Sequence, residues 1–224
     1  MTRDEVQDAA RQAFGGDDLA VDRWDRIVEM GWLMMTVPER QGGLGLGREA
    51  AGVIHTELGR TLVPGATIAQ MLVIEALSAA DSDDLLARAM GGEVMTASLT
   101  PGDTLDAVPN ADKASHVLSV MPDRIALVPL DGASIVPRQT WDKTRRLFDV
   151  HGVGDGITLA EGDTAAALGE RLQQTLLLAL AADSLGGAAA ILERTIAYLE
   201  VRRLFDRPLA MFQALKHRVA DMKT

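Results

Sequence analysis

Two groups of basic residues are the first features of the sequence that could do chemistry. One lies within residues 141–146 and the other within residues 202–207, where Phe205 stands among arginines and Gln213 follows soon after. A guanidinium group such as that of Arg202, beside an aromatic face and a carboxamide, could bind a pyrophosphate. Cations near the end of a helix are also favoured by the helix dipole alone, so the second group has a simple structural explanation as well.

Three other motifs do not support catalysis. Glycines recur through residues 42–47, but no Lys-Ser or Lys-Thr pair follows them, and residues 36–41 before them do not read as a strand. We therefore expect a structural loop between helices rather than a phosphate-binding loop. The four histidines are scattered without the spacing of metal ligands, which predicts no metal site. The sequence has no Gly-x-Ser-x-Gly elbow, which leaves serine hydrolysis unsupported.

Composition excludes several classes of function. The 224 residues include 22 Lys and Arg against 32 Asp and Glu, and the net charge of −10 repels nucleic acid and an anionic bilayer. The chain has no cysteine, which removes thiolate and disulfide chemistry and fits a cytoplasmic location. The most apolar stretch, residues 175–192, is interrupted by Asp183, so we expect a buried helix of a soluble bundle and no membrane span.

The spacing of apolar residues divides the chain into three parts. Helical spacing fills residues 1–92 and ends where two glycines break the pattern. Short β-type runs bounded by turn residues follow in residues 93–161, and we expect them to form antiparallel strands at 94–99, 117–120, 125–130, 134–136 and 147–150. Helical spacing returns in residues 162–224 as a long helix, a turn and a second helix starting near Pro208. The sequence thus predicts an α+β fold of three domains: an N-terminal helical domain, a small middle antiparallel β domain and a C-terminal domain of two helices.

Glycines in the helical parts predict how the helices pack. Gly59 follows a helical turn and is expected to cap the C-terminus of its helix. Gly186 and Gly187 lie inside the long helix, where glycine is costly unless a neighbouring helix needs the close approach. Because the second helix is short, the long helix would expose much apolar surface, and we expect the isolated chain to self-associate.

Ordered motifs along the chain resemble the acyl-CoA dehydrogenase family. Residues 31–39 (Gly-Trp to Val-Pro-Glu), 42–45 (Gly-Gly-Leu-Gly) and 57–60 (Glu-Leu-Gly-Arg) are similar to its N-terminal helical domain. Residues 141–146 (Trp-Asp-Lys-Thr-Arg-Arg) resemble the D-x-T-R-R element near the end of its middle β domain. Residues 198–222, which contain Arg-Arg-Leu-Phe-Asp-Arg-Pro-Leu and Phe-Gln-Ala, resemble the first two helices of its C-terminal bundle.

The resemblance implies an FAD-dependent oxidoreductase that dehydrogenates acyl-CoA thioesters of fatty acids or steroid side chains. It also implies a homo- or hetero-oligomer with another chain of the family, and an electron-transferring flavoprotein as electron acceptor. In the family, R-x-x-F-G and F-Q elements contact the adenine dinucleotide part of FAD held by a neighbouring subunit. By this likeness Arg202, Phe205 and Gln213 bind FAD, with Arg202 opposite the pyrophosphate. Leu204 and Asp206 stand where the family usually has a polar residue and a glycine.

The resemblance does not locate a catalytic residue. Removal of the α-proton of an acyl thioester needs a carboxylate. The family supplies it from the later part of the bundle or near the start of the long helix, where the matching position is about Leu176, and leucine cannot accept a proton. Thr100-Pro101-Gly102-Asp103 and residues 113–130 also lack the family's usual flavin-contacting motifs.

Three hypotheses follow for the function. The chain could be a partner subunit that contributes to a FAD site at a subunit interface. It could be a non-catalytic scaffold that has the same fold and binds no flavin. An unrelated helical binding module is a third hypothesis, which the order of the three motifs disfavours.

Overall fold

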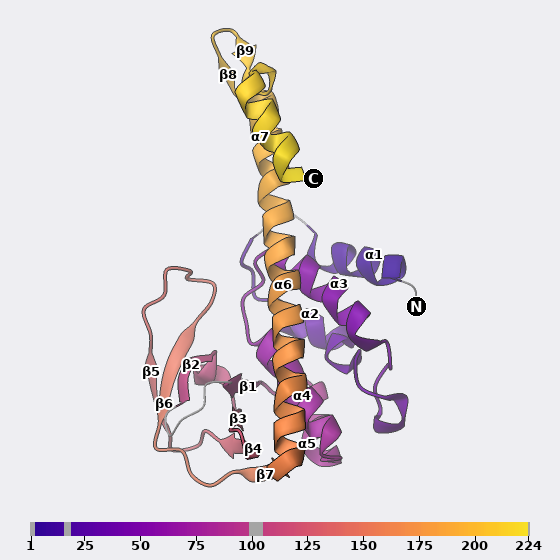
Figure 1. Cartoon of the computed structure of the whole chain (residues 1–224), viewed down its shortest axis with the longest axis vertical. Coiled ribbons are helices and arrows are strands. Elements are labelled where there is room, and N and C mark those ends of the chain that lie inside the picture. The colour runs from indigo at the N-terminus through magenta and orange to yellow at the C-terminus, as the bar shows by residue number, and fades with distance from the viewer. Residues whose placement is uncertain (1–2, 16–18, 99–104, 224) are drawn as a thin grey trace.

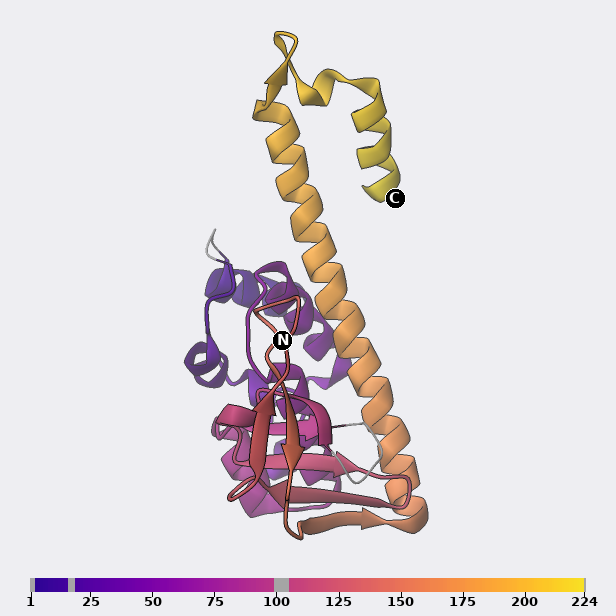
Figure 2. The ribbon, with the colours of Figure 1, turned by 90° about the vertical axis from the view of Figure 1, so that its left-hand side faces the viewer.

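The computed structural model describes residues 3–15, 19–98 and 105–223 of the chain. Figure 1 shows a body of short helices and a small β region, from which one long helix projects. In Figure 2, the last helix folds back beside the far end of the long helix. The order of helices, strands and helices confirms the predicted α+β fold class.

Within residues 3–15 and 19–98, five α-helices form the N-terminal part of the body. They are α1 (Arg3–Phe14), α2 (Trp24–Glu29), α3 (Gly47–Arg60), α4 (Thr67–Ala79) and α5 (Asp83–Met90). Their apolar faces share one core with the first strand and with the first half of the long helix. Phe14 and Trp32 pack edge to face in this core, with ring centroids 4.5 Å apart. α4 is the most apolar of these helices and is buried on most sides, because α5, β1 and α6 all pack against it.

The glycine-rich segment 42–47 is a structural loop, as predicted. The backbone N–H groups of Leu44 and Gly45 donate hydrogen bonds of 2.9 Å to the carbonyls of Met34 and Val37. Gly45 has a φ of +61°, a conformation that glycine adopts without strain. These amides are therefore used to close the loop against the preceding turn.

The described strands of the β region form two small sheets. The first has the order β1-β3-β4-β7, with β1 at Met95–Ser98, β3 at His116–Val120, β4 at Arg124–Pro129 and β7 at Ile157–Glu161. The second has the order β2-β6-β5, with β2 at Leu105–Pro109, β6 at Leu147–His151 and β5 at Ser134–Pro137. A second, smaller core that includes Val108, Val117 and Phe148 joins the two sheets.

The β region differs from the sequence prediction in two ways. β1 pairs with β3 in parallel, so the prediction of antiparallel strands is wrong for this pair and right for the other pairs in the two sheets as described. β2 and β7 are not predicted at all. β2 contains Asp106 and Pro109, which read as turn residues, and β7 buries only Ala160 fully, so neither shows the alternation that marks a strand.

The C-terminal part begins with α6 (Gly162–Val201), a helix of 40 residues. A two-stranded hairpin of β8 (Arg203–Leu204) and β9 (Arg207–Pro208) follows, and a short 3₁₀ turn leads into α7 (Gln213–Lys223). The prediction that the second helix starts near Pro208 is therefore wrong by five residues. Pro208 lies in β9, and the carbonyl of Phe212 accepts the first helical hydrogen bonds of α7 from Leu215 and Lys216.

Close contact between α3 and α6 depends on two glycines. A Cβ atom on Gly186 would overlap the backbone carbonyl of Thr56, and one on Gly59 would overlap the backbone carbonyl of Asp183. The close approach predicted from Gly186 is therefore confirmed. Gly59 is not a C-terminal cap, because α3 continues through it to Arg60. The pattern of residues around Gly59 does not distinguish a helix end from a helix crossing.

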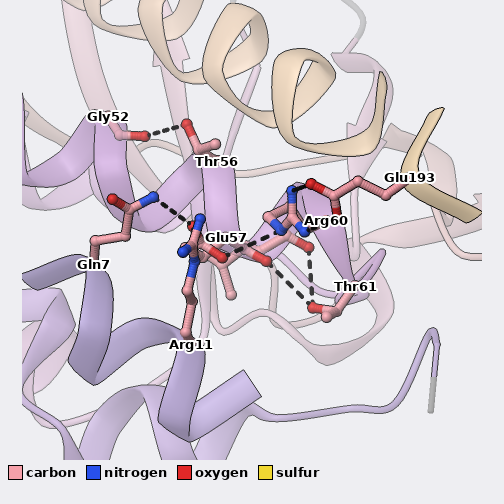
Figure 3. A network of polar contacts seen from close by, with 9 residues as sticks. Gln7, Arg11, Gly52, Thr56, Glu57, Arg60, Thr61 and Glu193 are labelled. Carbon is pink, nitrogen blue, oxygen red and sulfur yellow. Dashed lines mark hydrogen bonds and ion pairs between the residues drawn. The ribbon is translucent and has the colours of Figure 1, made fainter. Parts of the chain in front are cut away.

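A buried carboxylate ties α1, α3 and α6 together (Figure 3). Glu57 is 3% exposed and accepts hydrogen bonds from Gln7 at 3.0 Å and from Arg11 at 3.2 Å. Arg60, one turn further along α3, lies 3.5 Å from Glu57 and also pairs with Glu193 of α6 at 2.5 Å. Because a buried charge needs such partners, this network sets the position of α6 against the body.

α6 is long and apolar enough to cross a membrane, by its length and composition alone. It nevertheless lies along the body and forms ion pairs with it at three levels: Arg171 with Glu75, Asp183 with Arg145, and Glu193 with Arg60. Charged pairs spaced along a helix in this way would be costly inside a bilayer. α6 therefore packs against the body, but the prediction that residues 175–192 are buried is wrong for this chain, because only Ala179 and Gly186 are buried in that stretch.

Candidate functional site

A cavity of about 430 Å³ lies between the helical part, the β region and α6. Its walls come from the end of α3, the start of α4, the first strands and the middle of α6. Most of the lining is apolar, and five titratable side chains interrupt it: His55, Asp106, Arg145, Arg146 and Asp183. A mostly apolar cavity with a few polar groups is the usual form of a small-molecule site.

Arg145 and Asp183 form an ion pair at the edge of this first cavity. Both terminal oxygens of Asp183 lie 3.0 Å from Nη2 of Arg145, and Nη1 of Arg145 donates to the carbonyl of Val63 at 3.0 Å. The neighbouring Arg146 pairs with Asp112 at 2.5 Å. Arg145 therefore holds the β region against α6 and the loop after α3, and Arg146 is paired within the β region.

Leu176 lines the first cavity from α6. It is partly buried and packs against the main core, and Leu180 follows it on the same side of the helix. The matching position for a catalytic base thus does face the cavity, but it presents a hydrocarbon side chain. Asp183, one turn beyond Leu180, is committed to Arg145.

A second cavity, of about 400 Å³, lies on the other side of α6. Arg171 lies 2.6 Å from Glu75 at this cavity, and Arg48 lies 3.4 Å from the same carboxylate. Thr175 also lines it, and its hydroxyl oxygen is buried without a hydrogen-bond partner in the part of the chain that the structure describes.

His55 of α3 lines both cavities. Its side chain is 4% exposed, and burial lowers its pKa to about 4, so the ring is neutral at pH 7. Sequence reasoning missed this residue, because a lone histidine on an apolar helix face is usually part of the core. Among the described residues, no group of three His, Cys, Asp or Glu side chains is placed to hold a metal ion.

The three residues predicted to bind FAD lie far from both cavities, at the distal end of α6 (Figures 1 and 2). Arg202 caps α6 and its carbonyl accepts a hydrogen bond of 2.7 Å from Leu209. Phe205 is at the tip of the hairpin and is 79% exposed, and Gln213 is the first residue of α7. The structure thus brings Arg202, Phe205 and Gln213 to one end of the molecule, and all three are exposed.

The other two arginines of the hairpin are engaged locally. The guanidinium of Arg203 donates to the backbone carbonyl of Asp206, and the guanidinium of Arg207 lies 4.1 Å from the ring centroid of Phe212. The Phe205 and Phe212 rings are 6.5 Å apart. Among the described residues, the guanidinium of Arg202 has no such partner. Residues Thr100 to Asp103, which are predicted to lack a flavin-contacting motif of the family, lie outside the described residues.

Family models match both ends of the chain. The model described as "Acyl-CoA dehydrogenase, N-terminal domain" matches residues 1–90, and the one described as "Acyl-CoA dehydrogenase, C-terminal domain" matches residues 176–224. The matched N-terminal segment contains α1 to α5, and the matched C-terminal segment contains most of α6 and all of α7.

Individual relatives agree with these matches. The chain is 34% identical to the acyl-CoA dehydrogenase IpdE2 of Mycolicibacterium smegmatis over 204 residues, which are 89% of this chain and 60% of that protein. Among solved structures, the Tcur3481-Tcur3483 steroid ACAD G363A variant has a TM-score of 0.82 at 26% identity, covering 98% of this chain and 72% of that chain. The ChsE4-ChsE5 complex from Mycobacterium tuberculosis shares the fold, with a TM-score of 0.78 at 21% identity over 98% and 70% of the two chains. The chain thus spans about three fifths of the length of the curated relative.

Proposed function

Since the chain belongs to the acyl-CoA dehydrogenase family, we propose that it is a subunit of an FAD-dependent oxidoreductase that dehydrogenates acyl-CoA thioesters. In this proposal the hairpin at the end of α6 contributes to a FAD site on a neighbouring chain, in a homo- or hetero-oligomer. The electrons pass to an electron-transferring flavoprotein, as the family implies. The names of two solved relatives, Tcur3481-Tcur3483 and ChsE4-ChsE5, each join two chains, and they support a hetero-oligomer here.

The position of Arg202 carries the proposal. Arg202 lies nineteen residues beyond Asp183 on a continuous helix, which places it about 30 Å past the edge of the first cavity at 1.5 Å per residue. A side chain at that distance does not reach a molecule bound in the first cavity. The exposure of the hairpin supports a cofactor held by another chain.

The residues of the hairpin fit a dinucleotide. The segment 202–207 has three guanidinium groups and one carboxylate, so its charge favours an anion. Arg202 supplies a guanidinium without another partner among the described residues, and it suits a pyrophosphate because it can donate two parallel hydrogen bonds. Phe205 offers an exposed aromatic face, and Gln213 offers a carboxamide next to the free amides at the start of α7. When bound, FAD would supply the acceptor for the hydride that leaves the acyl group.

The first cavity fits the acyl group of the substrate. Leu58, Leu72, Leu176 and Leu180 give it an apolar lining that removes hydrocarbon from water, at roughly 25 cal/mol for each Å² of apolar surface buried. The carboxylate that removes the α-proton would have to come from elsewhere than Leu176. In this proposal the first cavity binds the acyl group, and a carboxylate from elsewhere removes the α-proton. This division of roles agrees with a chain that is one subunit of a larger assembly.

The test of the FAD role is retention of flavin by the assembled protein. The chain is coexpressed with a second acyl-CoA dehydrogenase chain from the same source, the complex is purified, and bound FAD is measured from its visible absorption. We expect Arg202→Ala to lower the FAD content of the complex by at least tenfold. Arg218→Ala is the matched control, because Arg218 is an exposed arginine on α7 outside the hairpin, and it should leave the FAD content unchanged.

Leu176 stands where the family can have a catalytic carboxylate, and its side chain cannot accept a proton. This favours a second candidate function, a scaffold of the same fold that binds no flavin. This candidate predicts that every purified complex lacks a flavin absorption band, and that Arg202→Ala changes nothing. The presence of FAD in the complex, with its loss in Arg202→Ala, would exclude the scaffold. A complex that forms but never contains flavin would instead exclude the FAD role.

A further inference from the structure

The lining of the second cavity has an excess of positive charge, although the chain as a whole has a net charge of −10. The charged side chains among the described residues that line it are three arginines and two carboxylates: Arg40, Arg48, Arg171, Glu75 and Asp81. His55, which also lines it, is neutral at pH 7. Since two carboxylates cannot neutralise three guanidinium groups, this cavity favours a ligand with one negative charge.

Arg48 and Arg171 share a single carboxylate oxygen. Nε of Arg171 lies 2.6 Å from Oε1 of Glu75, and Nη2 of Arg48 lies 3.4 Å from the same atom. The second distance is longer than the roughly 2.7–2.9 Å of a charge-assisted hydrogen bond. Arg48 can therefore turn to another anion while Glu75, whose side chain is 14% exposed, keeps Arg171 as its partner.

Arg40 is a second available guanidinium on the same cavity. It is exposed, and within the part of the chain that the structure describes its side chain makes no hydrogen bond or ion pair. Asp81, the other carboxylate of the cavity, accepts a hydrogen bond of 3.0 Å from Gln41. Arg40 and Arg48 lie before and after the glycine-rich loop, which is closed by its own backbone hydrogen bonds. Two cations are thus placed on one cavity by a well-defined loop.

The rest of the lining determines what kind of anion fits. Val37, Met71 and Leu178 bring apolar side chains to the cavity from three separate segments. A volume of about 400 Å³ is in the usual range for a small-molecule site. Glu75 and Asp81 would repel a second negative charge, and the apolar side chains would gain nothing from an inorganic ion. A monoanion with a hydrocarbon part therefore matches the lining.

We propose that the second cavity binds a small monocarboxylate with a hydrocarbon tail. Arg40 and Arg48 hold the carboxylate, because guanidinium groups donate paired hydrogen bonds to its two oxygens. The tail lies against Val37, Met71 and Leu178. This site is independent of the proposed binding of acyl-CoA and FAD, so it stands or falls separately from them. A ligand held there joins the loop to α4 and α6, and it should raise the melting temperature of the chain.

The test is isothermal titration calorimetry of the full chain at pH 7.5 and low ionic strength with octanoate, octanol and acetate. Octanol lacks the charge, and acetate lacks the tail. We expect octanoate to bind about tenfold more tightly than either of the other two. Octanol binding as tightly as octanoate would overturn the role of the arginines, and acetate binding as tightly would overturn the role of the tail. An absence of octanoate binding would overturn the site itself.

Arginine variants locate the binding. Arg40→Ala and Arg48→Ala should each weaken octanoate binding at least fivefold and leave the affinity for octanol unchanged. Arg26→Ala is the matched control, because Arg26 is as exposed as Arg48, at 49%, and also lies 3.4 Å from a glutamate, but it does not line the second cavity. Folding is checked from the melting temperature without ligand, which Arg40→Ala should not change. An octanoate affinity that survives in the Arg40→Ala, Arg48→Ala double variant would place the binding elsewhere and overturn the proposal.

Discussion

Arg145 and Asp183 join the β region to the middle of α6 through two hydrogen bonds of 3.0 Å that converge on one guanidinium nitrogen. Both side chains are partly buried, at 32% and 21% exposed, so water screens the pair less than it screens a surface ion pair. Since the same guanidinium also binds the carbonyl of Val63, it connects three segments that are distant in sequence.

Removing either partner of this pair should destabilise the fold. We expect Arg145→Ala and Asp183→Asn each to lower the free energy of unfolding by about 1.5–3 kcal/mol, because each leaves a partly buried charge without its partner. Urea denaturation of both single variants and of the double variant measures the coupling. Effects that simply add in the double variant would show that the two side chains do not interact energetically.

Gly186 and Gly187 provide a matched pair of substitutions on one helix. Gly186→Ala should destabilise the protein by about 1–3 kcal/mol, because its Cβ would overlap the backbone of α3. Gly187→Ala has ordinary contact distances, with the nearest atom at 3.6 Å, and should stabilise the helix by up to about 1 kcal/mol. Thermal unfolding of the two variants gives the comparison. Similar melting temperatures for both would contradict the close approach of α3 and α6.

Some elements follow from local sequence and others from contacts between distant segments. The close approach at Gly186 is predictable because a glycine inside a long helix needs a reason. Its counterpart Gly59 is mistaken for a helix cap, since the reason for that glycine lies on α6, more than a hundred residues further along the chain. The parallel pairing of β1 with β3 is missed for a similar reason, because turn residues mark strand ends and do not specify which neighbour a strand takes.

The same distinction between local sequence and contacts of distant segments applies to the candidate site. That Arg202, Phe205 and Gln213 lie at one end of the molecule is predictable because they are close together in the sequence, and their role in binding FAD stays a prediction. The first cavity is not predictable, because its walls come from α3, α4, the strands and α6, and no single segment shows them. His55 gives no signal in the sequence, because its place beside both cavities depends on how the surrounding helices pack.

Burial of His55 makes stability depend on pH. The pKa of the ring is about 4 in the folded protein and about 6.5 in an unfolded chain, so between these values the unfolded state binds a proton that the folded state does not. The contribution of the neutral His55 ring to the free energy of unfolding is therefore fully present above pH 6.5. It is lost as the pH falls towards 4, by roughly 3 kcal/mol in total. His116 acts in the same direction, because burial lowers its pKa as well.

Urea denaturation at pH 7.5, 6.0 and 5.0 measures this dependence. His55→Gln removes the titrating ring, so we expect its free energy of unfolding to fall less between pH 7.5 and pH 5.0 than that of the unchanged chain. His151→Gln is the control, because His151 is exposed on β6. An identical pH dependence in the unchanged chain and in His55→Gln would show that the ring is not buried in solution.

The exposed face of α6 should make the isolated chain associate. Leu177, Leu185 and Ile191 are 60–64% exposed on this helix, and they form part of an apolar surface that a stable monomer rarely leaves in water. We expect light scattering to show a mass above that of the 23.9 kDa monomer at high protein concentration.

Leu177→Glu with Leu185→Glu should shift the chain towards the monomer, because the added charges face solvent in the monomer and must be buried in any assembly that covers α6. Glu161→Lys, an exposed charge change before α6, should leave association unchanged. A mass equal to the monomer for the unchanged chain at every concentration would contradict the prediction and would mean that water alone covers this face.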